Sequence, residues 1–195
     1  ANVTALRTDA GLVLFDVGSP LTAADAREQL RGWSRAPVHT VVYTHGHIDH
    51  VLGAGLYDAE ERPEGSPPMR VVAHRAVSAR FARYRLTAGY NGVINARQFG
   101  VEGMRWPTDY REPDVTHDDG LTLDVGGVRV ELHHARGETD DHTWAWLPAQ
   151  RAVCAGDLFI WASPNCGNPQ KVQRYPLDQA VALDRMAALE PDLLL

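Results

Sequence analysis

Apolar and polar positions along the chain change period several times, and each change marks an expected element. In the N-terminal part, residues 2–7 and 12–15 predict two strands around a turn at residues 9–11. A helix is expected to begin at Thr22, because Asp25 three residues later is placed to complete a capping box. Three residues at helical spacing give that helix its apolar stripe: Ala26, Leu30 and Trp33.

The next part of the chain alternates strand and helix patterns. Residues 38–44 form a β-branched run that predicts a buried strand, and a loop is expected at residues 45–50. Residues 70–74 predict a further strand and residues 76–84 a helix. Residues 87–113 show no clear period, and structureless segments of that length are usually functional lids or disordered.

The second half of the chain returns to a β pattern. Four strands are expected in two hairpins: residues 121–125 with 128–134, and residues 143–147 with 152–155. Two consecutive glycines, Gly126 and Gly127, are a strong signal for the first hairpin turn. Pro176 opens a predicted helix, and residues 192–195 look like an interrupted strand. Two blocks of strands, each followed by helices, indicate an α/β layered fold in one domain spanning residues 1–195.

Composition narrows the class of protein without identifying it. Hydrophobic residues make up 44% and charged residues 23% of the 195 positions, which is ordinary for a globular domain and excludes disordered and fibrous classes. Two cysteines, Cys154 and Cys166, are too few for a disulfide scaffold or a thiolate zinc site. The net charge of −6 argues against a general nucleic-acid binder, and no apolar run reaches the roughly 18 residues of a membrane span.

Four potential metal ligands lie within six residues, directly after the strand expected at residues 38–44. They are His45, His47, Asp49 and His50, in the order H-x-H-x-D-H. Nine histidines scattered through the chain would give one or two close pairs by chance, but not this cluster. Imidazole and carboxylate groups are ligands typical of zinc, and Gly46 allows the backbone to turn between the first two histidines.

This cluster resembles the signature of the metallo-β-lactamase fold hydrolases. The flanking sequence agrees, because residues 11–18 are similar to the strand and turn that open this fold, and Gly156-Asp157 resembles its later metal-bridging aspartate. The resemblance covers residues 2–195 and implies an α/β fold of the αββα four-layer sandwich type, with a one- or two-metal site at the sheet edge. It also implies zinc as the metal and hydrolysis by a metal-bound hydroxide.

The resemblance assigns roles to individual residues. His45 and His47 would bind the first metal, Asp49 and His50 the second, and Asp157 would bridge the two. Asp49 is also the expected catalytic residue, since it would hold the attacking water or carry its proton.

The chain departs from the common family pattern at the third ligand position. Most members carry a histidine in a Pro-Gly-His-Thr type turn, whereas residues 134–139 place Glu138 there. A glutamate at this position resembles the alkylsulfatase branch. An anionic ligand lowers the net charge of the metal cluster, so that bound water is a weaker acid than at an all-imidazole centre.

A second departure concerns the last family ligand, a histidine in a Gly-His turn after the final strand. No histidine follows His142, and the chain stops at the apolar run 193–195. The chain also begins without methionine, so both ends look cut, and the fold is expected to be truncated at its C-terminal end. The alternative is an incomplete second metal site.

Several further residues could act near the metal site, but each also has an ordinary structural explanation. Asp140, Asp141 and His142 are placed either to orient the ligands or to form a surface loop. His134, at a strand end, is expected nearer the metals than His133. Four other residues are expected to have ordinary structural roles: His39, His74, His117 and Cys154.

Two segments carry clustered positive or polar groups. Residues 70–100 contain six arginines and no acidic residue, which favours a solvated helix face over an anion-attracting patch. Residues 161–175 are expected to line the mouth of the site, with Asn165, Lys171 and Arg174 as candidates for binding a sulfate, phosphate or carboxylate. Three tryptophans are candidates for an apolar wall, with core packing the default: Trp144, Trp146 and Trp161.

The sequence therefore favours a zinc-dependent hydrolase acting on alkyl sulfates or related esters of small molecules, for which an anionic substrate is one option. Three alternatives stay open: a hydrolase of lactones, thioesters or β-lactams, an iron-dependent oxidoreductase, and a non-catalytic member with an incomplete metal site. Family members with di-iron flavoprotein chemistry carry glutamate where His47 stands, which counts against the second alternative. Oligomeric state and compartment are left open.

Overall fold

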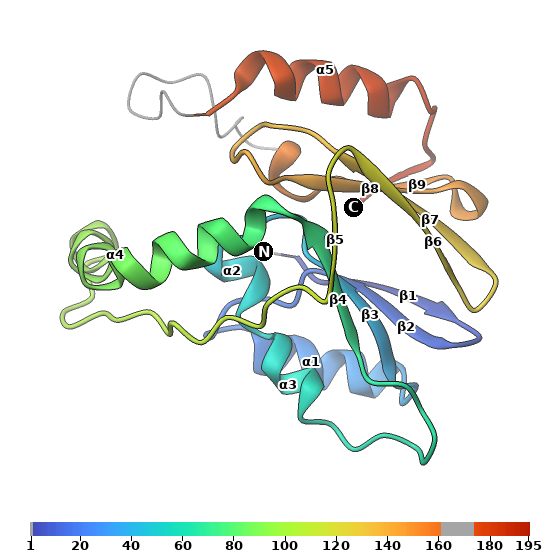
Figure 1. Ribbon diagram of the computed structural model, residues 1–195, viewed down its shortest axis with the longest axis horizontal. Helices are drawn as coiled ribbons and strands as arrows, with labels where there is room; N and C mark the ends of the chain where they lie inside the picture. Colours follow the sequence, from blue (N-terminus) through green and yellow to red (C-terminus); the bar gives the residue numbers. More distant parts are fainter. Residues whose placement is uncertain (1, 161–173) are drawn as a thin grey trace.

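Two five-stranded β-sheets pack face to face in the computed structural model, which describes residues 2–160 and 174–195 (Figure 1). The first sheet has the order β1-β2-β3-β4-β5. Its strands are β1 (Thr4–Thr8), β2 (Gly11–Phe15), β3 (Val38–Val42), β4 (Arg70–His74) and β5 (Val115–His117). β1 runs antiparallel to β2, and the other neighbours are parallel.

The second sheet comes from the C-terminal half of the chain and has the order β10-β9-β8-β7-β6. Its strands are β6 (Gly120–Val125), β7 (Val128–His134), β8 (Thr143–Leu147), β9 (Ala152–Cys154) and β10 (Leu193–Leu194). All neighbours are antiparallel except β9 and β10. The two predicted hairpins, β6–β7 and β8–β9, are confirmed.

Helices cover the outer faces of both sheets (Figure 1). The helices are α1 (Ala23–Trp33), α2 (Ile48–Val51), α3 (Ala54–Asp58), α4 (Ala76–Phe99) and α5 (Pro176–Ala187), with short 3₁₀ turns η1 (Pro148–Gln150) and η2 (Gly156–Leu158). Residues from α1, α3 and α4 pack on the first sheet, and α5 packs on the second. None of the described helices combines the length and the apolar character needed to cross a membrane.

Alternation along the central strands produces three apolar layers. In β2, Leu12 and Leu14 face the helices of the first sheet, whereas Val13 and Phe15 face the second sheet. In β8 the tryptophans, Trp144 and Trp146, face α5 and are buried there, as core packing predicts. The expected αββα sandwich is therefore confirmed.

The prediction of a structureless segment at residues 87–113 was wrong for its first half. Helix α4 runs 24 residues to Phe99 instead of ending at residue 84. The sequence of its second half shows no clear amphipathic period, because apolar residues also occupy exposed positions there: Leu86, Tyr90 and Val93. A Cβ built on Gly92 would lie 2.8 Å from the carbonyl oxygen of Met104, so this glycine allows close contact with the chain that returns along the helix.

Three smaller expectations also failed. Thr22 makes no side-chain cap bond to α1, because its Oγ1 lies 3.0 Å from the hydroxyl of Ser19 instead. Trp33 is 57% exposed and does not complete the apolar stripe. The loop expected at residues 45–50 turns into α2 at Ile48. β5 was not expected at all, since it is short and not distinctly apolar.

Gly53 holds the segment after α2 against the end of β2. Its N–H donates to the carbonyl oxygen of Gly18 over 3.2 Å, and a Cβ at this position would lie only 2.0 Å from the carbonyl oxygen of Val17. In contrast, a Cβ at Gly55, in α3, would meet no heavy atom within 4 Å. The chain therefore offers a matched pair of glycines two residues apart.

We predict that Gly53→Ala lowers the free energy of unfolding by about 1–3 kcal/mol, because the new methyl group overpacks a backbone contact. Gly55→Ala should raise it by roughly 0.5–1 kcal/mol, because alanine is the better helix former. Urea unfolding of both variants and the parent chain measures the two effects. Equal changes in the two variants would contradict the close packing at Gly53.

Candidate metal centre

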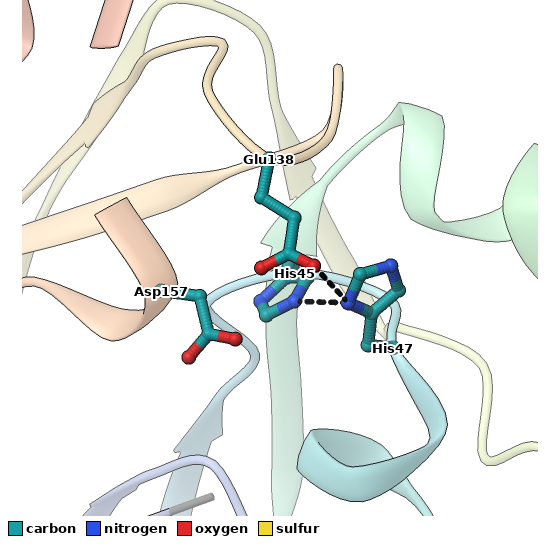
Figure 2. Close-up of side chains that lie close together, drawn as sticks. All are labelled: His45, His47, Glu138 and Asp157. Atoms are coloured by element: carbon teal, nitrogen blue, oxygen red, sulfur yellow. Dashed lines mark hydrogen bonds and ion pairs between the residues drawn. The ribbon is translucent and has the colours of Figure 1, made fainter. Parts of the chain in front are cut away.

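The candidate site lies at one end of the two sheets, where segments distant in sequence converge (Figure 2). His45 and His47 follow the carboxyl end of β3, the edge at which parallel strands commonly place ligand-binding residues. Glu138 comes from the β7–β8 connection and Asp157 from η2 after β9. Both sheets therefore supply donors to one place.

The side chains of these four residues form a compact donor group. One ligand atom from each of His45, His47, Glu138 and Asp157 lies within 4.8 Å of the others. Nε2 of His45 is 2.8 Å from Nδ1 of His47, which is 3.5 Å from Oε1 of Glu138 (Figure 2). The structure thus brings together two donors from the H-x-H-x-D-H motif and two from the second half of the chain.

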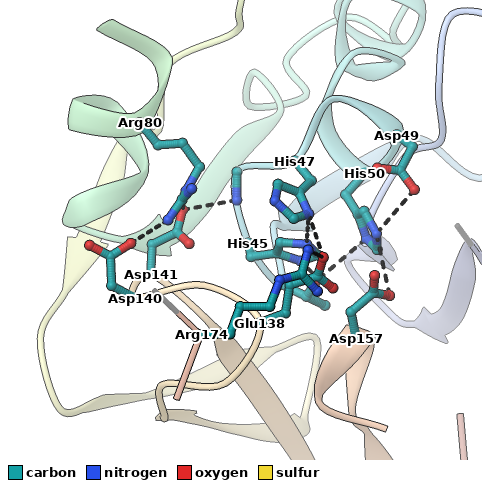
Figure 3. Close-up of polar contacts among 12 residues, drawn as sticks. His45, His47, Asp49, His50, Arg80, Glu138, Asp140, Asp141, Asp157 and Arg174 are labelled. Atoms are coloured by element: carbon teal, nitrogen blue, oxygen red, sulfur yellow. Dashed lines mark hydrogen bonds and ion pairs between the residues drawn. The ribbon is translucent and has the colours of Figure 1, made fainter. Parts of the chain in front are cut away.

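His50 lies beside this group and faces two carboxylates (Figure 3). Its Nε2 is 3.4 Å from Oδ1 of Asp157 and 3.5 Å from Oδ2 of Asp49. Ligand atoms 2.0–2.2 Å from one tetrahedral ion lie roughly 3.3–3.6 Å apart. Asp157 is therefore close both to the donor group of His45, His47 and Glu138 and to His50. The six residues expected as ligands thus lie together in one place.

Asp16 orients the histidines from behind. It lies in the family-like segment 11–18, but no role was assigned to it from the sequence. Its carboxylate accepts the backbone N–H and the hydroxyl of Thr44, both over 2.7 Å, and Oδ2 lies 2.6 Å from Nδ1 of His50. The hydroxyl of Thr44 is 3.0 Å from Nδ1 of His45. With their Nδ1 atoms engaged, His45 and His50 direct Nε2 toward the donor group, the arrangement usual for metal-binding histidines.

Burial and charge set the protonation of the histidines. Burial lowers the pKa of His45 well below its ordinary value and lowers the pKa of His47 to about 3, with Arg80 adding to the second effect. Burial opposes charge on His50 as well, but Asp16 and Asp157 outweigh it and raise the pKa of His50 to about 10. His45 and His47 are therefore neutral at pH 7, the form that binds metal, whereas binding at His50 requires its proton to leave.

Asp141 clamps the turn between His45 and His47. Its buried Oδ2 accepts the N–H of Gly46 over 3.0 Å and Nε–H of Arg80 over 2.8 Å, and Arg80 also pairs with Asp140 (Figure 3). A Cβ on Gly46 would lie 2.9 Å from Asp141 Oδ2, so glycine is needed for this close approach. The surface-loop interpretation is therefore wrong for Asp141.

Arg80 also corrects the interpretation of the arginine-rich segment as a solvated face. Its side chain is only 9% exposed, and its ion pair with Asp141 is buried beside the turn between His45 and His47. Arg75, by contrast, is exposed and pairs with Asp118 on the surface, as a solvated face predicts. Net charge along a segment does not reveal which arginine is buried, so the sequence could not single out Arg80.

The remaining histidines pack rather than join the donor group. His142 is fully buried and stacks on His45, with ring centroids 4.5 Å apart. His134, expected near the metals, instead stacks on His74 at 3.9 Å, and its Nδ1 lies 2.9 Å from the carbonyl oxygen of His142. Nε2 of His117 is 3.2 Å from the hydroxyl of Thr143. His134 and His142 therefore support the site from outside the group of six.

Of the three expected anion-binding residues, only Arg174 falls within the described part of the chain. Its Nη2 lies 2.7 Å from Oε1 of Glu138, the carboxylate oxygen that also faces His47 (Figure 3). Four other residues named from the sequence lie outside the described residues: Trp161, Asn165, Cys166 and Lys171. Arg174 thus places a positive charge directly against a candidate metal ligand.

Comparison with known proteins gives a family match over the whole chain. A family model described as the metallo-beta-lactamase superfamily matches residues 1–195. The linear primary-alkylsulfatase of Pseudomonas sp. (strain ATCC 19151) is 22% identical over 206 residues, which cover 94% of this chain and 38% of the relative. The 2,4-dinitroanisole O-demethylase subunit alpha of Nocardioides sp. (strain JS1661) is 30% identical over 170 residues, which cover 80% of this chain and 50% of the relative. The chain therefore spans half or less of each of these relatives.

Solved structures agree on the fold. A double mutant of the sec-alkyl sulfatase PisA1 matches with a TM-score of 0.73 and 22% identity, over 97% of this chain and 33% of that one. TTHA1623, solved in a di-iron-bound form, matches with a TM-score of 0.67 and 21% identity, over 100% of this chain and 85% of that one. At these identities the likeness supports the architecture and leaves the reaction open.

We predict that Asp141→Ala lowers the free energy of unfolding by about 3–5 kcal/mol, because it leaves the charge of Arg80 without its buried partner. Asp140→Ala removes the exposed partner of the same arginine and should cost less than about 1 kcal/mol. Asp141→Asn keeps an acceptor for the N–H of Gly46 and should fall between the two. Urea unfolding of the three variants measures the order, and a cost for Asp140→Ala equal to that of Asp141→Ala would refute the clamp.

Proposed function

The chain belongs to the metallo-beta-lactamase superfamily, and on that premise we propose that it is a metal-dependent hydrolase of small esters. The observation that carries the proposal is the donor group of His45, His47, Glu138 and Asp157, whose ligand atoms lie within 4.8 Å of one another. These residues come from three separate connections in the fold. Neutral imidazoles and carboxylates that converge in this largely buried place form the kind of donor set that binds a metal ion.

The donor set supports a centre for one or two zinc ions. His45, His47 and Glu138 would hold one ion, and Asp49 with His50 would hold the other, with Asp157 placed to bridge. Neutral imidazole nitrogens and carboxylate oxygens suit zinc, and the contacts of Thr44 and Asp16 with the two Nδ1 atoms fix the histidine rings in the required orientation.

When bound, such a metal lowers the pKa of water and polarises the ester oxygen. Asp49 is the residue proposed to orient the attacking water and accept its proton, because its carboxylate is 47% exposed at the open side of the site and still lies near His50. Glu138 and Asp157 add negative charge at the centre, which keeps the acidity of that water lower than at an all-imidazole site.

Alkyl sulfates and related esters are the proposed substrates. Two features support this class: the likeness to a linear primary-alkylsulfatase and the presence of Glu138 at the third ligand position. Arg174 lies against Glu138 and supplies the positive charge that a sulfate group would need at the centre. Asn165 and Lys171 are proposed to help bind the same anionic group.

A second candidate is an iron-dependent reaction of the same fold. Three of the six proposed ligands are carboxylates, Asp49, Glu138 and Asp157, and such hard oxygen donors suit iron better than a site built from imidazole alone. The likeness to a protein solved in a di-iron-bound form supports the same option. Elemental analysis of the purified chain separates the candidates, because zinc supports the hydrolase and iron with visible absorption supports the alternative.

We predict that His47→Ala reduces bound zinc at least tenfold and abolishes hydrolysis, because it removes a donor from the centre of the group. His39→Ala is the matched control, since His39 lies at the start of β3, outside the donor group, and its Nδ1 is 2.8 Å from the neighbouring hydroxyl of Thr40. Metal content after dialysis and turnover of sulfate, carboxylic ester and lactone substrates are the measurements. Full zinc content and full activity in His47→Ala would contradict the assignment of His47 as a metal ligand.

We also predict that Asp49→Asn lowers kcat by about 10²–10⁴-fold while leaving the unfolding midpoint unchanged, because the amide cannot accept the proton of the attacking water. Asp58→Asn, an exposed carboxylate in α3 that pairs with Arg111, should retain the kcat of the parent. Steady-state kinetics on the best substrate of the panel compares the two. Unchanged kcat in Asp49→Asn would exclude this residue from proton transfer.

A further inference from the structure

A cavity of about 460 Å³ opens beside the candidate metal centre. His47 and Asp49 line it at one side, together with residues of α4 and of the segment that follows this helix. Figure 1 shows that this segment returns along α4 toward β5. Five residues of α4 line it at helical spacing: Tyr84, Ala88, Asn91, Asn95 and Phe99. The returning chain supplies the opposite wall with Trp106 and Tyr110 among others. The volume lies within the range of small-molecule sites.

The wall of this cavity is aromatic and almost uncharged. Among the described residues that line it, Asp49 at the mouth is the one acidic group, and no lysine or arginine is present. Two arginines contact lining residues without lining the cavity themselves: Arg83 lies over the ring of Tyr84, and Arg85 lies over the ring of Tyr110 and pairs with Glu112. Because no cationic side chain lines the cavity among the described residues, an anionic group inside it would lack a direct ion-pair partner, and a neutral occupant is favoured.

The aromatic walls are held in place without a ligand. Nε1–H of Trp106 donates to Oδ1 of Asn95 over 2.7 Å, which fixes the indole against α4. Tyr110 stacks on the buried ring of Phe81, with centroids 4.5 Å apart and an angle of 16°. Rings that are fixed before binding lose little conformational freedom when a ligand arrives.

We propose that this cavity binds an uncharged aromatic group of the substrate. A flat ring can stack on the fixed indole of Trp106, whereas the ring of Tyr110 is already stacked on Phe81 and closes the wall behind it. A cavity of roughly 150 Å³ is already enough for benzene. The available volume therefore accommodates a substituted or fused ring. The placement of the scissile bond at His47 and Asp49 rests on the proposed function, whereas binding of the ring does not.

The test uses two neutral probes, 2-naphthol and octan-1-ol, with binding to the whole chain measured by calorimetry. Octan-1-ol is the more apolar molecule, so hydrophobic partition alone favours it, whereas stacking on aromatic walls favours 2-naphthol. We expect 2-naphthol to bind at least fivefold more tightly. Tighter binding of octan-1-ol would overturn the aromatic assignment.

Substitutions locate the probe within the molecule. Ala88 is the smallest side chain on the lining face of α4, and Ala88→Trp should fill the cavity and weaken 2-naphthol binding at least tenfold. Ala82→Trp adds the same side chain at an exposed position of the same helix and should bind 2-naphthol as the parent does. Equal binding by the parent and Ala88→Trp would place the ring elsewhere.

A third variant covers the case in which Ala88→Trp does not fold. Trp106→Leu keeps an apolar wall but removes the stacking surface, so it should weaken 2-naphthol binding several-fold and leave octan-1-ol binding unchanged. These binding measurements need neither metal nor turnover, so their outcome does not depend on whether the hydrolase proposal is correct. An active hydrolase whose binding of 2-naphthol is unaffected by both Ala88→Trp and Trp106→Leu would overturn the cavity assignment alone.

Discussion

The buried carboxylate of Asp16 is the interaction on which the rest of the site depends. It accepts the N–H and the hydroxyl of Thr44 and lies 2.6 Å from Nδ1 of His50. The carbonyl oxygen of Thr44 in turn accepts the N–H of Thr143 in the second sheet over 2.6 Å. Asp16 itself has a left-handed φ of 59°, and a non-glycine residue retains such a conformation when its surroundings hold it firmly. One carboxylate therefore links β2, the ligand loop and, through Thr44, the opposite sheet.

Local pattern predicted most of the sheet, because the buried strands carry apolar residues that alternate between two cores. β2, β4 and β7 end within about a residue of their expected limits for this reason. β5 escaped prediction because three residues carry no period, and it forms a strand only by pairing with β4. The capping box at Thr22 failed because Ser19 competes for the same hydroxyl. Such competition depends on a turn whose geometry the sequence pattern does not reveal.

The candidate site also contains residues that local sequence predicted and residues that it did not. The four donors of the H-x-H-x-D-H motif are neighbours in sequence, so their residue types alone indicated metal chemistry. Glu138 and Asp157 became candidates only through a family resemblance, since nothing local distinguishes them from turn residues. Arg80 and Asp16 were missed because each acts through a partner far along the chain, Asp141 for the first and Thr44 for the second. The sequence therefore indicated the donors better than the groups that hold them.

The prediction that the helix of residues 76–84 ends at residue 84 was wrong, and the reason lies in the sequence of α4. Its apolar period weakens after Tyr84, because the face that continues from this residue carries Ala88, Asn91 and Asn95 instead of a uniform apolar stripe. A helix face that packs on a core must be apolar throughout, whereas a face that lines a cavity can keep amides, which here bond to Trp106 and Thr87. Natural sequences break a local rule most often where function requires it. The positions at which the period of α4 is lost are therefore the positions that line the cavity beside the candidate metal centre.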